Sequence, residues 1–140
     1  MNNSKNSVVF FINEFVTRIP GYKIDRVLAI MKSKKLNVSA YYFNSDYYTI
    51  KKVLNESSTK HIQTILIWDF SQLKISFEKR LFILKLALQK NISIIEIWTE
   101  MELKDKDGKI DYDCLIRLLF TPTDGHKVIS IVRRFLTNAA

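Results

Sequence analysis

Glycine, proline and cysteine are scarce in this chain of 140 residues, which has three glycines, two prolines and one cysteine. So few turn-forming residues leave little room for disordered linkers or for an all-β meander. The single cysteine, Cys114, has no partner for an internal disulfide, which is typical of the reducing cytoplasm. Because it lies in the apolar stretch CLIRLLF, we expect a buried thiol rather than a nucleophile.

Long hydrophobic runs are missing as well, and none approaches the roughly 18 residues that a membrane-spanning helix needs. The first residues, MNNSKNS, are polar and lack the apolar core of a secretion signal. Hydrophobic residues make up 47% of the chain and charged residues 26%, which is typical of a globular protein with a buried core. We therefore expect a cytoplasmic protein in which residues 1–140 form a single domain.

The patterns of common cofactor and metal sites are also missing. Glycines at positions 21, 108 and 125 are too far apart to form a phosphate-binding loop. No histidine or cysteine pair has the spacing of metal ligands. Residues 104–113 resemble a calcium loop, but Leu103 and Cys114 occupy its first and last ligand positions. We therefore expect no cofactor, no metal and no small-molecule substrate.

Short apolar segments alternate along the chain with longer segments of helical pattern. The predicted strands are residues 8–13, 37–43, 63–69 and 92–98, and the predicted helices are residues 21–35, 45–60, 76–90, 111–120 and 126–137. Continuous apolar runs in the first and third strands favour strands covered on both faces. The alternation predicts a three-layer α/β domain with a central, mostly parallel sheet of four or five strands. Residues 99–110 are polar, and we expect a loop there.

Residues 64–98 carry the most specific pattern in the chain. Trp68 and Asp69 end an apolar strand, and Leu73 and Ser76 belong to the short connection that follows. The helix then opens with Phe77, Glu78, Arg80 and Leu81. A second apolar strand follows that helix. This arrangement resembles the strand–helix–strand core of the serine recombinase (resolvase/invertase) catalytic domain, and fainter matches extend toward both ends of the chain. The resemblance implies a resolvase-like fold over residues 1–140, without the DNA-binding module that follows the catalytic domain in that family.

The chemistry of that family needs a serine after the first strand, which attacks a DNA phosphodiester. It also needs arginines, whose guanidinium groups neutralise the charge that develops on the phosphoryl oxygens. Carried over residue by residue, the serine position holds Glu14, and the arginine positions hold Ile12, Gln72, Ile75 and the pair Tyr47-Tyr48. The resemblance therefore implies a protein that has lost its catalytic groups, so we expect no enzyme.

Two segments carry candidate residues for binding a partner. One is the start of the second predicted helix, with Tyr47, Tyr48, Lys51 and Lys52; the other is the C-terminal segment, with Val128, Ile131 and Phe135. Aromatic and basic side chains at the rim of an α/β sheet can stack on bases or hold a peptide. They can equally be core residues with their hydroxyls in water. The apolar C-terminal residues either cover the sheet or bind a second copy of the chain.

The net charge of +8 is concentrated in residues 1–60, which carry ten Lys and Arg against four Asp and Glu. A basic half suits DNA, although a lysine-rich solvated surface has the same composition. We favour a non-catalytic oligomerisation or regulatory module. The resemblance to serine recombinases suggests an origin in a mobile element, plasmid or phage. The module's partner would be itself or another protein. The alternatives are a DNA-binding regulator, an enzyme with a relocated site, and a STAS-like signalling domain.

Overall fold

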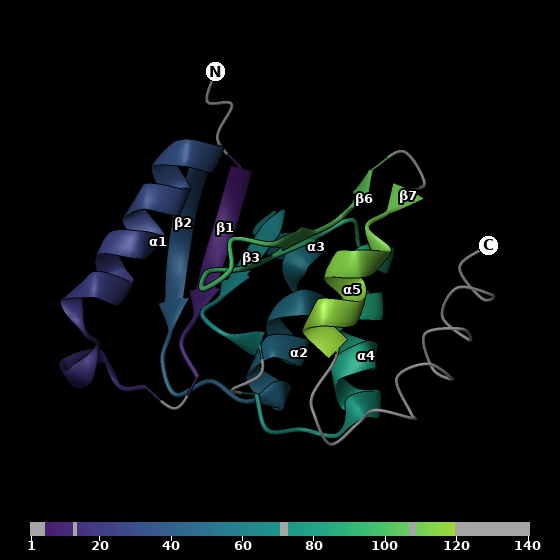
Figure 1. Ribbon diagram of the computed structural model, residues 1–140, viewed down its shortest axis with the longest axis horizontal. Helices are drawn as coiled ribbons and strands as arrows, with labels where there is room; N and C mark the ends of the chain where they lie inside the picture. Colours follow the sequence, from purple (N-terminus) through teal and green to yellow (C-terminus); the bar gives the residue numbers. More distant parts are fainter. Residues whose placement is uncertain (1–4, 13, 71–72, 107–108, 120–140) are drawn as a thin grey trace.

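The computed structural model describes residues 5–12, 14–70, 73–106 and 109–119. Its elements follow one another as an α/β alternation (Figure 1). In chain order they are β1 (Lys5–Phe10), η1 (Val16–Arg18), α1 (Gly21–Lys34), β2 (Leu36–Tyr42), α2 (Tyr47–Asn55), α3 (Ser57–Lys60), β3 (Thr64–Ile67), α4 (Phe77–Gln89), β4 (Ser93–Glu96), β5 (Glu102–Leu103), β6 (Asp105–Lys106), β7 (Lys109–Ile110) and α5 (Tyr112–Leu119).

The central sheet has five strands in the order β2-β1-β3-β4-β5. The first four strands of this order run parallel, and β5 is antiparallel to β4. This arrangement confirms the predicted α/β class and the mostly parallel sheet. The chain moves from β1 outward to β2 and then returns to the other side of β1 with β3, so the order reverses between β1 and β3. In open α/β sheets, ligands bind at such a reversal, outside the carboxyl ends of the strands.

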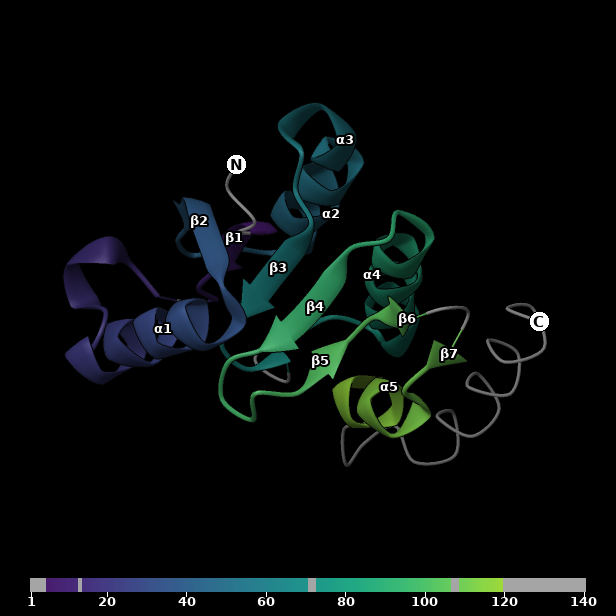
Figure 2. The same cartoon turned by 90° about the horizontal axis from the view of Figure 1, so that it is seen from above.

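Helices cover both faces of the sheet, with α1 on one side and α2, α4 and α5 on the other (Figure 2). Successive strand residues point to opposite faces, which divides the core into two clusters. In β3, Ile65 packs toward α2 and α4, whereas Leu66 packs toward α1. Both side chains are fully buried. The continuous apolar runs in the sequence therefore do mark strands that are covered on both faces.

Side-chain caps determine where two helices begin. Asp46 precedes α2 and accepts a hydrogen bond from the Thr49 backbone N–H at 2.9 Å. Ser76 precedes α4 and accepts one from the Lys79 backbone N–H at 3.2 Å. Each cap pairs an amide that has no partner within the helix. The prediction of one helix over residues 45–60 is wrong at its end, because the helical conformation breaks at Glu56 and a short α3 follows.

The loop predicted for residues 99–110 contains regular structure, which corrects that prediction. Here β5 pairs with the edge of the sheet, placing Leu103 opposite Ile94, and β6 pairs with β7. Leu103 is fully buried and Met101 packs against the same core. Strands of two residues are too short to show a period in the sequence, so only their pairing reveals them.

The helix expected over residues 126–137, with Val128, Ile131 and Phe135, lies outside the described residues, and so does Gln72. Within the described ranges, no helix combines the length and the apolar character needed to cross a bilayer.

Candidate functional site

The carboxyl ends of β1, β2, β3 and β4 lie along one edge of the sheet, and the segments that follow these strands form the candidate site. These segments begin at Phe11, Phe43, Trp68 and Ile97. Phe11 and Phe43 stack with their ring centroids 5.4 Å apart, which ties the first two segments together. The Ser45 backbone N–H also donates to the Phe11 carbonyl at 2.9 Å. The order reversal between β1 and β3 places this edge where the fold binds ligands.

A small cavity of about 150 Å³ lies beside the end of β1, and its described lining residues are Ile12, Ser45, Asp46, Tyr47, Leu73, Lys74 and Ile75. Three of these stand where the resemblance implies arginines. Ile12 and Tyr47 are buried and Ile75 is half-buried. The structure therefore brings Ile12, Tyr47 and Ile75 together around one cavity, and the described part of its wall contains no guanidinium group.

The polar groups of this cavity are poorly suited to attack on a phosphate. The hydroxyl of Ser45 is buried, and among the described residues it has no hydrogen-bond partner that could act as a base. Hydrogen bonds from the backbone and side chain of Thr49 lower the pKa of Asp46, which keeps that carboxylate negative. A negative charge here repels phosphate, and Lys74 is the one cation among the described lining residues.

Glu14, which stands at the implied serine position, is engaged within the chain. Its carboxylate forms an ion pair with Lys23 of α1, and both side chains are largely buried. The Lys23 ammonium group also lies 4.8 Å from the centroid of the Trp68 ring. This carboxylate is therefore neutralised by a neighbouring helix.

Three aromatic side chains, Tyr22, Trp68 and Trp98, form what we call the carboxyl-edge aromatic cluster. Trp68 is buried at the centre, with Tyr22 edge-on at 5.9 Å and Trp98 tilted at 5.9 Å between ring centroids. The outer rings reach the surface, since Tyr22 is 61% exposed and Trp98 54% exposed. The sequence prediction did not include this cluster, because its members come from α1 and from the ends of two strands.

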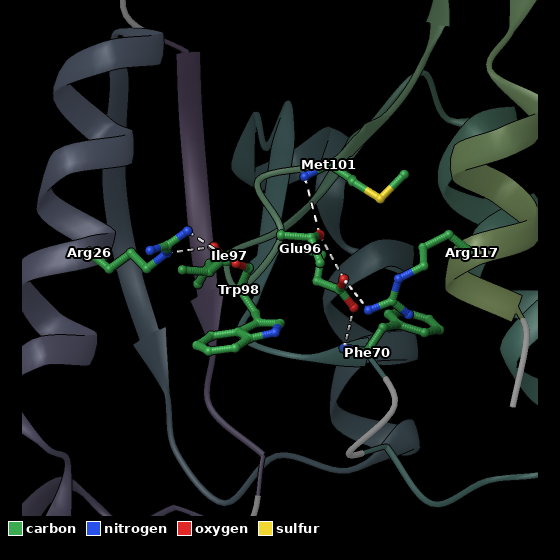
Figure 3. Close-up of polar contacts among 8 residues, drawn as sticks. Arg26, Phe70, Glu96, Ile97, Trp98, Met101 and Arg117 are labelled. Carbon is green, nitrogen blue, oxygen red and sulfur yellow. Dashed lines mark hydrogen bonds and ion pairs between the residues drawn. The ribbon is translucent and has the colours of Figure 1, made fainter.

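Arg26 of α1 holds the segment that carries Trp98 (Figure 3). Its Nε donates to the Ile97 carbonyl and its Nη2 to the Trp98 carbonyl, both at 3.0 Å. These two bonds join α1 to the end of β4 and fix the backbone from which the Trp98 ring projects.

Glu96, the last residue of β4, is fully buried and forms a polar network on the other side of the sheet (Figure 3). Its carboxylate accepts hydrogen bonds from the Phe70 backbone N–H at 2.9 Å and from the Thr99 hydroxyl at 2.7 Å. Arg117 of α5 approaches the same carboxylate, with 3.4 Å between Nη2 and Oε1. The network joins the connection after β3, the end of β4 and α5. The sequence stretch ISIIEIW does not reveal it.

The predicted partner residues of α2 divide between core and surface. Tyr47 is only 8% exposed, which corrects its assignment to a partner surface. Tyr48 and Lys52 are exposed and Lys51 is half-buried, so these three remain candidates. Neighbouring residues of a helix point in different directions, so the Tyr47 ring packs toward α4 while the Tyr48 ring points to solvent.

Cys114 is buried in α5, as the sequence indicates. Burial, together with the nearby carboxylates of Asp111, Glu96 and Glu102, raises the pKa of its thiol to about 11. A protonated, buried thiol is a poor nucleophile. Within the described residues, no group of three or more His, Cys, Asp and Glu side chains could hold a metal ion.

Comparison with solved structures finds a likeness to the crystal structure of a resolvase family site-specific recombinase from Streptococcus pneumoniae. The TM-score is 0.62 over 96% of this chain and 93% of that chain, with 11% sequence identity. No protein-family model matches the sequence, and no curated protein matches it significantly. At this identity the likeness concerns the fold, and this chain has a resolvase-like fold.

Proposed function

We propose that this chain is a non-catalytic protein of the resolvase fold that acts as an oligomerisation module, with a second copy of itself as its partner. The observation that carries the proposal is the composition of the carboxyl edge. Where the resemblance implies a nucleophile and arginines, this edge has Ile12, Tyr47 and Ile75 in the wall of a cavity and a carboxylate neutralised by Lys23. Next to them lie exposed aromatic rings.

The loss of chemistry follows from the charge that a phosphoryl transfer must stabilise. Removing a single preorganised donor from such a site costs about 3–4 kcal/mol of transition-state stabilisation. Here Ile12, Tyr47 and Ile75 replace several donors at once. Lys74 is exposed and carries a point charge, which cannot make the forked contact of a guanidinium group.

The carboxyl-edge aromatic cluster supports the binding role. Tyrosine and tryptophan are enriched among the residues that dominate interface energies, because each buries a large rigid surface. Tyr22 and Trp98 offer such surfaces on a backbone held by Arg26. A second copy of the chain could bury these rings.

Incubation of the purified chain with supercoiled plasmid DNA tests the non-catalytic part. We expect neither nicking nor a covalent protein–DNA adduct at any protein concentration, because the described site lacks an activated nucleophile. Denaturing electrophoresis separates adduct from free protein. Nicking that disappears in the Ser45→Ala variant would overturn the proposal, since it would identify a relocated nucleophile.

Sedimentation velocity over a range of concentrations tests the oligomerisation. We expect a concentration-dependent oligomer, weakened by roughly 30-fold or more in the Tyr22→Ala and Trp98→Ala variants, as for interface hot spots. Tyr48→Ala is the matched control, because its ring is similarly exposed and belongs to α2, which lies on the opposite side of the sheet from α1. A strict monomer, or equal weakening by Tyr48→Ala, contradicts the proposal.

A further inference from the structure

Helices α2 and α4 pack against each other on the face of the sheet opposite α1 (Figure 2). Their side chains form an alternating row of rings and ammonium groups. In order, this ring–ammonium row consists of Phe82, Lys51, Tyr47, Lys79 and Tyr48. The Lys51 Nζ lies 5.4 Å from the Phe82 centroid and 6.0 Å from the Tyr47 centroid. The Lys79 Nζ lies 5.1 Å from the Tyr47 centroid and 5.4 Å from the Tyr48 centroid.

The two ends of the row are open to solvent. Tyr48 is 66% exposed and Phe82 is 44% exposed, whereas Tyr47 is buried between them. The buried Tyr47 ring packs edge-on against the exposed Tyr48 ring, with 5.2 Å between their centroids. The row therefore has a packed middle and two rings whose faces a ligand can reach.

The charge around the row is positive. Helices α2 and α4 carry Lys51, Lys52, Lys79 and Lys85 against one acid, Glu78, and the Asp46 carboxylate that caps α2 adds a second negative charge beside Tyr47. Arg80 does not contribute to this surface, since it is buried and donates to the Leu119 carbonyl at 3.0 Å. The surface cations of these two helices are thus all lysines.

A groove of about 210 Å³ opens beside Phe82, and its described lining residues are Phe82, Lys85, Leu86 and Gln89. It combines an aromatic ring, an aliphatic wall, a cation and a side-chain amide. An amide supplies both a donor and an acceptor for the edge of a planar polar ring. The groove and the ring–ammonium row share Phe82 and form one continuous surface.

We propose that this α2–α4 surface binds a single-stranded polynucleotide. Exposed rings stack on bases that are unpaired, and stacking tolerates any base sequence. Lysines neutralise the phosphates as point charges, without the bidentate contacts by which arginine reads guanine. A duplex hides its base faces, and an acidic peptide offers the lysines a charge but leaves Tyr48 and Phe82 without a stacking partner. The inference is independent of the proposed oligomerisation, which uses the opposite side of the sheet.

Fluorescence anisotropy of the full chain with a labelled, mixed-sequence single strand of about 20 nucleotides tests the inference. The same sequence as a duplex, and poly-glutamate, serve as competitors. We expect the single strand to bind at least about tenfold more tightly than the duplex, and poly-glutamate to displace it weakly. If four lysines contact phosphates, a plot of the logarithm of the binding constant against the logarithm of the salt concentration should have a slope of about −3.

Variants separate stacking from charge. Tyr48→Ala and Phe82→Ala should each weaken binding by about fivefold or more without changing the salt slope. Lys51→Gln and Lys79→Gln should each make the slope shallower by about 0.7. Tyr41→Ala and Lys32→Gln, which change an exposed ring of β2 and an exposed lysine of α1 outside the α2–α4 surface, are the matched controls and should bind like the unchanged protein.

The inference would be overturned by no binding at low salt, by equal binding of duplex or poly-glutamate, or by unchanged binding in the Tyr48→Ala and Phe82→Ala variants. Equal weakening by Lys32→Gln and Lys51→Gln would also overturn it, because it would indicate an attraction without a site. Loss of oligomerisation in the Tyr22→Ala and Trp98→Ala variants, with unchanged binding of the single strand, would show that the two surfaces act separately.

Discussion

Glu96 is the residue at which burial and charge conflict most directly. A buried carboxylate is unfavourable unless hydrogen bonds and an opposite charge compensate for its lost hydration. Here the Phe70 amide and the Thr99 hydroxyl donate to it, and Arg117 approaches from α5. The Arg117 side chain is 41% exposed and can regain water if the pair is broken, whereas the Phe70 amide cannot. Removal of Glu96 therefore leaves a buried amide without an acceptor, whereas removal of Arg117 leaves a buried carboxylate without its opposite charge.

We predict that Glu96→Ala lowers the free energy of unfolding by about 3 kcal/mol, because it leaves a buried amide without an acceptor. Arg117→Gln should lower it by about 1–3 kcal/mol, because it leaves the fully buried Glu96 carboxylate with its hydrogen bonds but without its opposite charge. Urea unfolding followed by circular dichroism measures both. Glu100→Ala, at an exposed carboxylate, is the control and should be nearly neutral. An effect of either Glu96→Ala or Arg117→Gln as small as that of Glu100→Ala would contradict this account of the network.

Among the elements, α2 and α4 begin with the same kind of cap but with different chemistry. Asp46 caps α2 with a charged group, and Ser76 caps α4 with a neutral hydroxyl. Hydrogen bonds from Thr49 lower the pKa of Asp46 below its ordinary value of 3.8. The stability that the charged cap contributes is therefore present above about pH 4. It is lost as the pH falls through the lowered pKa of the folded state.

We predict that Asp46→Ala lowers the free energy of unfolding by about 1 kcal/mol at neutral pH, and that this difference shrinks as the pH falls below 4. Asp46→Asn should keep most of the cap at neutral pH, since asparagine caps helices nearly as well. Urea unfolding at a series of pH values measures the differences. Ser76→Ala is the matched control, with a similar loss that does not depend on pH. An Asp46→Ala effect that stays constant down to pH 2 would rule out the charged cap.

Across the whole molecule, one sheet supports two core clusters. Adjacent residues of β3 belong to different clusters, as Ile65 and Leu66 show. Neither cluster can be exposed without disrupting strands that the other one needs. The two sides of the sheet should therefore unfold together, although α1 lies on one side and α2, α4 and α5 on the other.

We predict that Ile65→Ala and Leu66→Ala each lower the free energy of unfolding by about 2–5 kcal/mol and leave the urea m-value unchanged. Tryptophan fluorescence reports on the α1 side, because Trp68 belongs to that cluster, and circular dichroism reports on all helices. The two signals should give coincident transitions in both variants. Separate transitions in either variant would mean that the two sides of the sheet unfold independently.

The class of fold and the main elements follow from local patterns along the chain. Continuous apolar runs, helical spacing and the capping residues Asp46 and Ser76 each depend on neighbours within a few positions, so they can be recognised in one dimension. The same holds for Glu14 and Ile12, which can be read at the positions that the resemblance implies as soon as the first strand is placed. These features predicted an α/β domain with a mostly parallel sheet, and the structure confirms it.

The surfaces were decided by how the elements pack. The rotation of α2 buries Tyr47 and exposes Tyr48, and its packing against α4 brings Lys51 to Phe82. Strand register brings Trp68 beside Trp98. Such contacts join segments that are tens of residues apart, and they depend on helix rotation and strand register. A pattern within one segment contains neither the helix rotation nor the strand register. The amino-acid sequence by itself therefore determined the α/β framework, and tertiary packing decided which side chains meet and which are exposed on its surface.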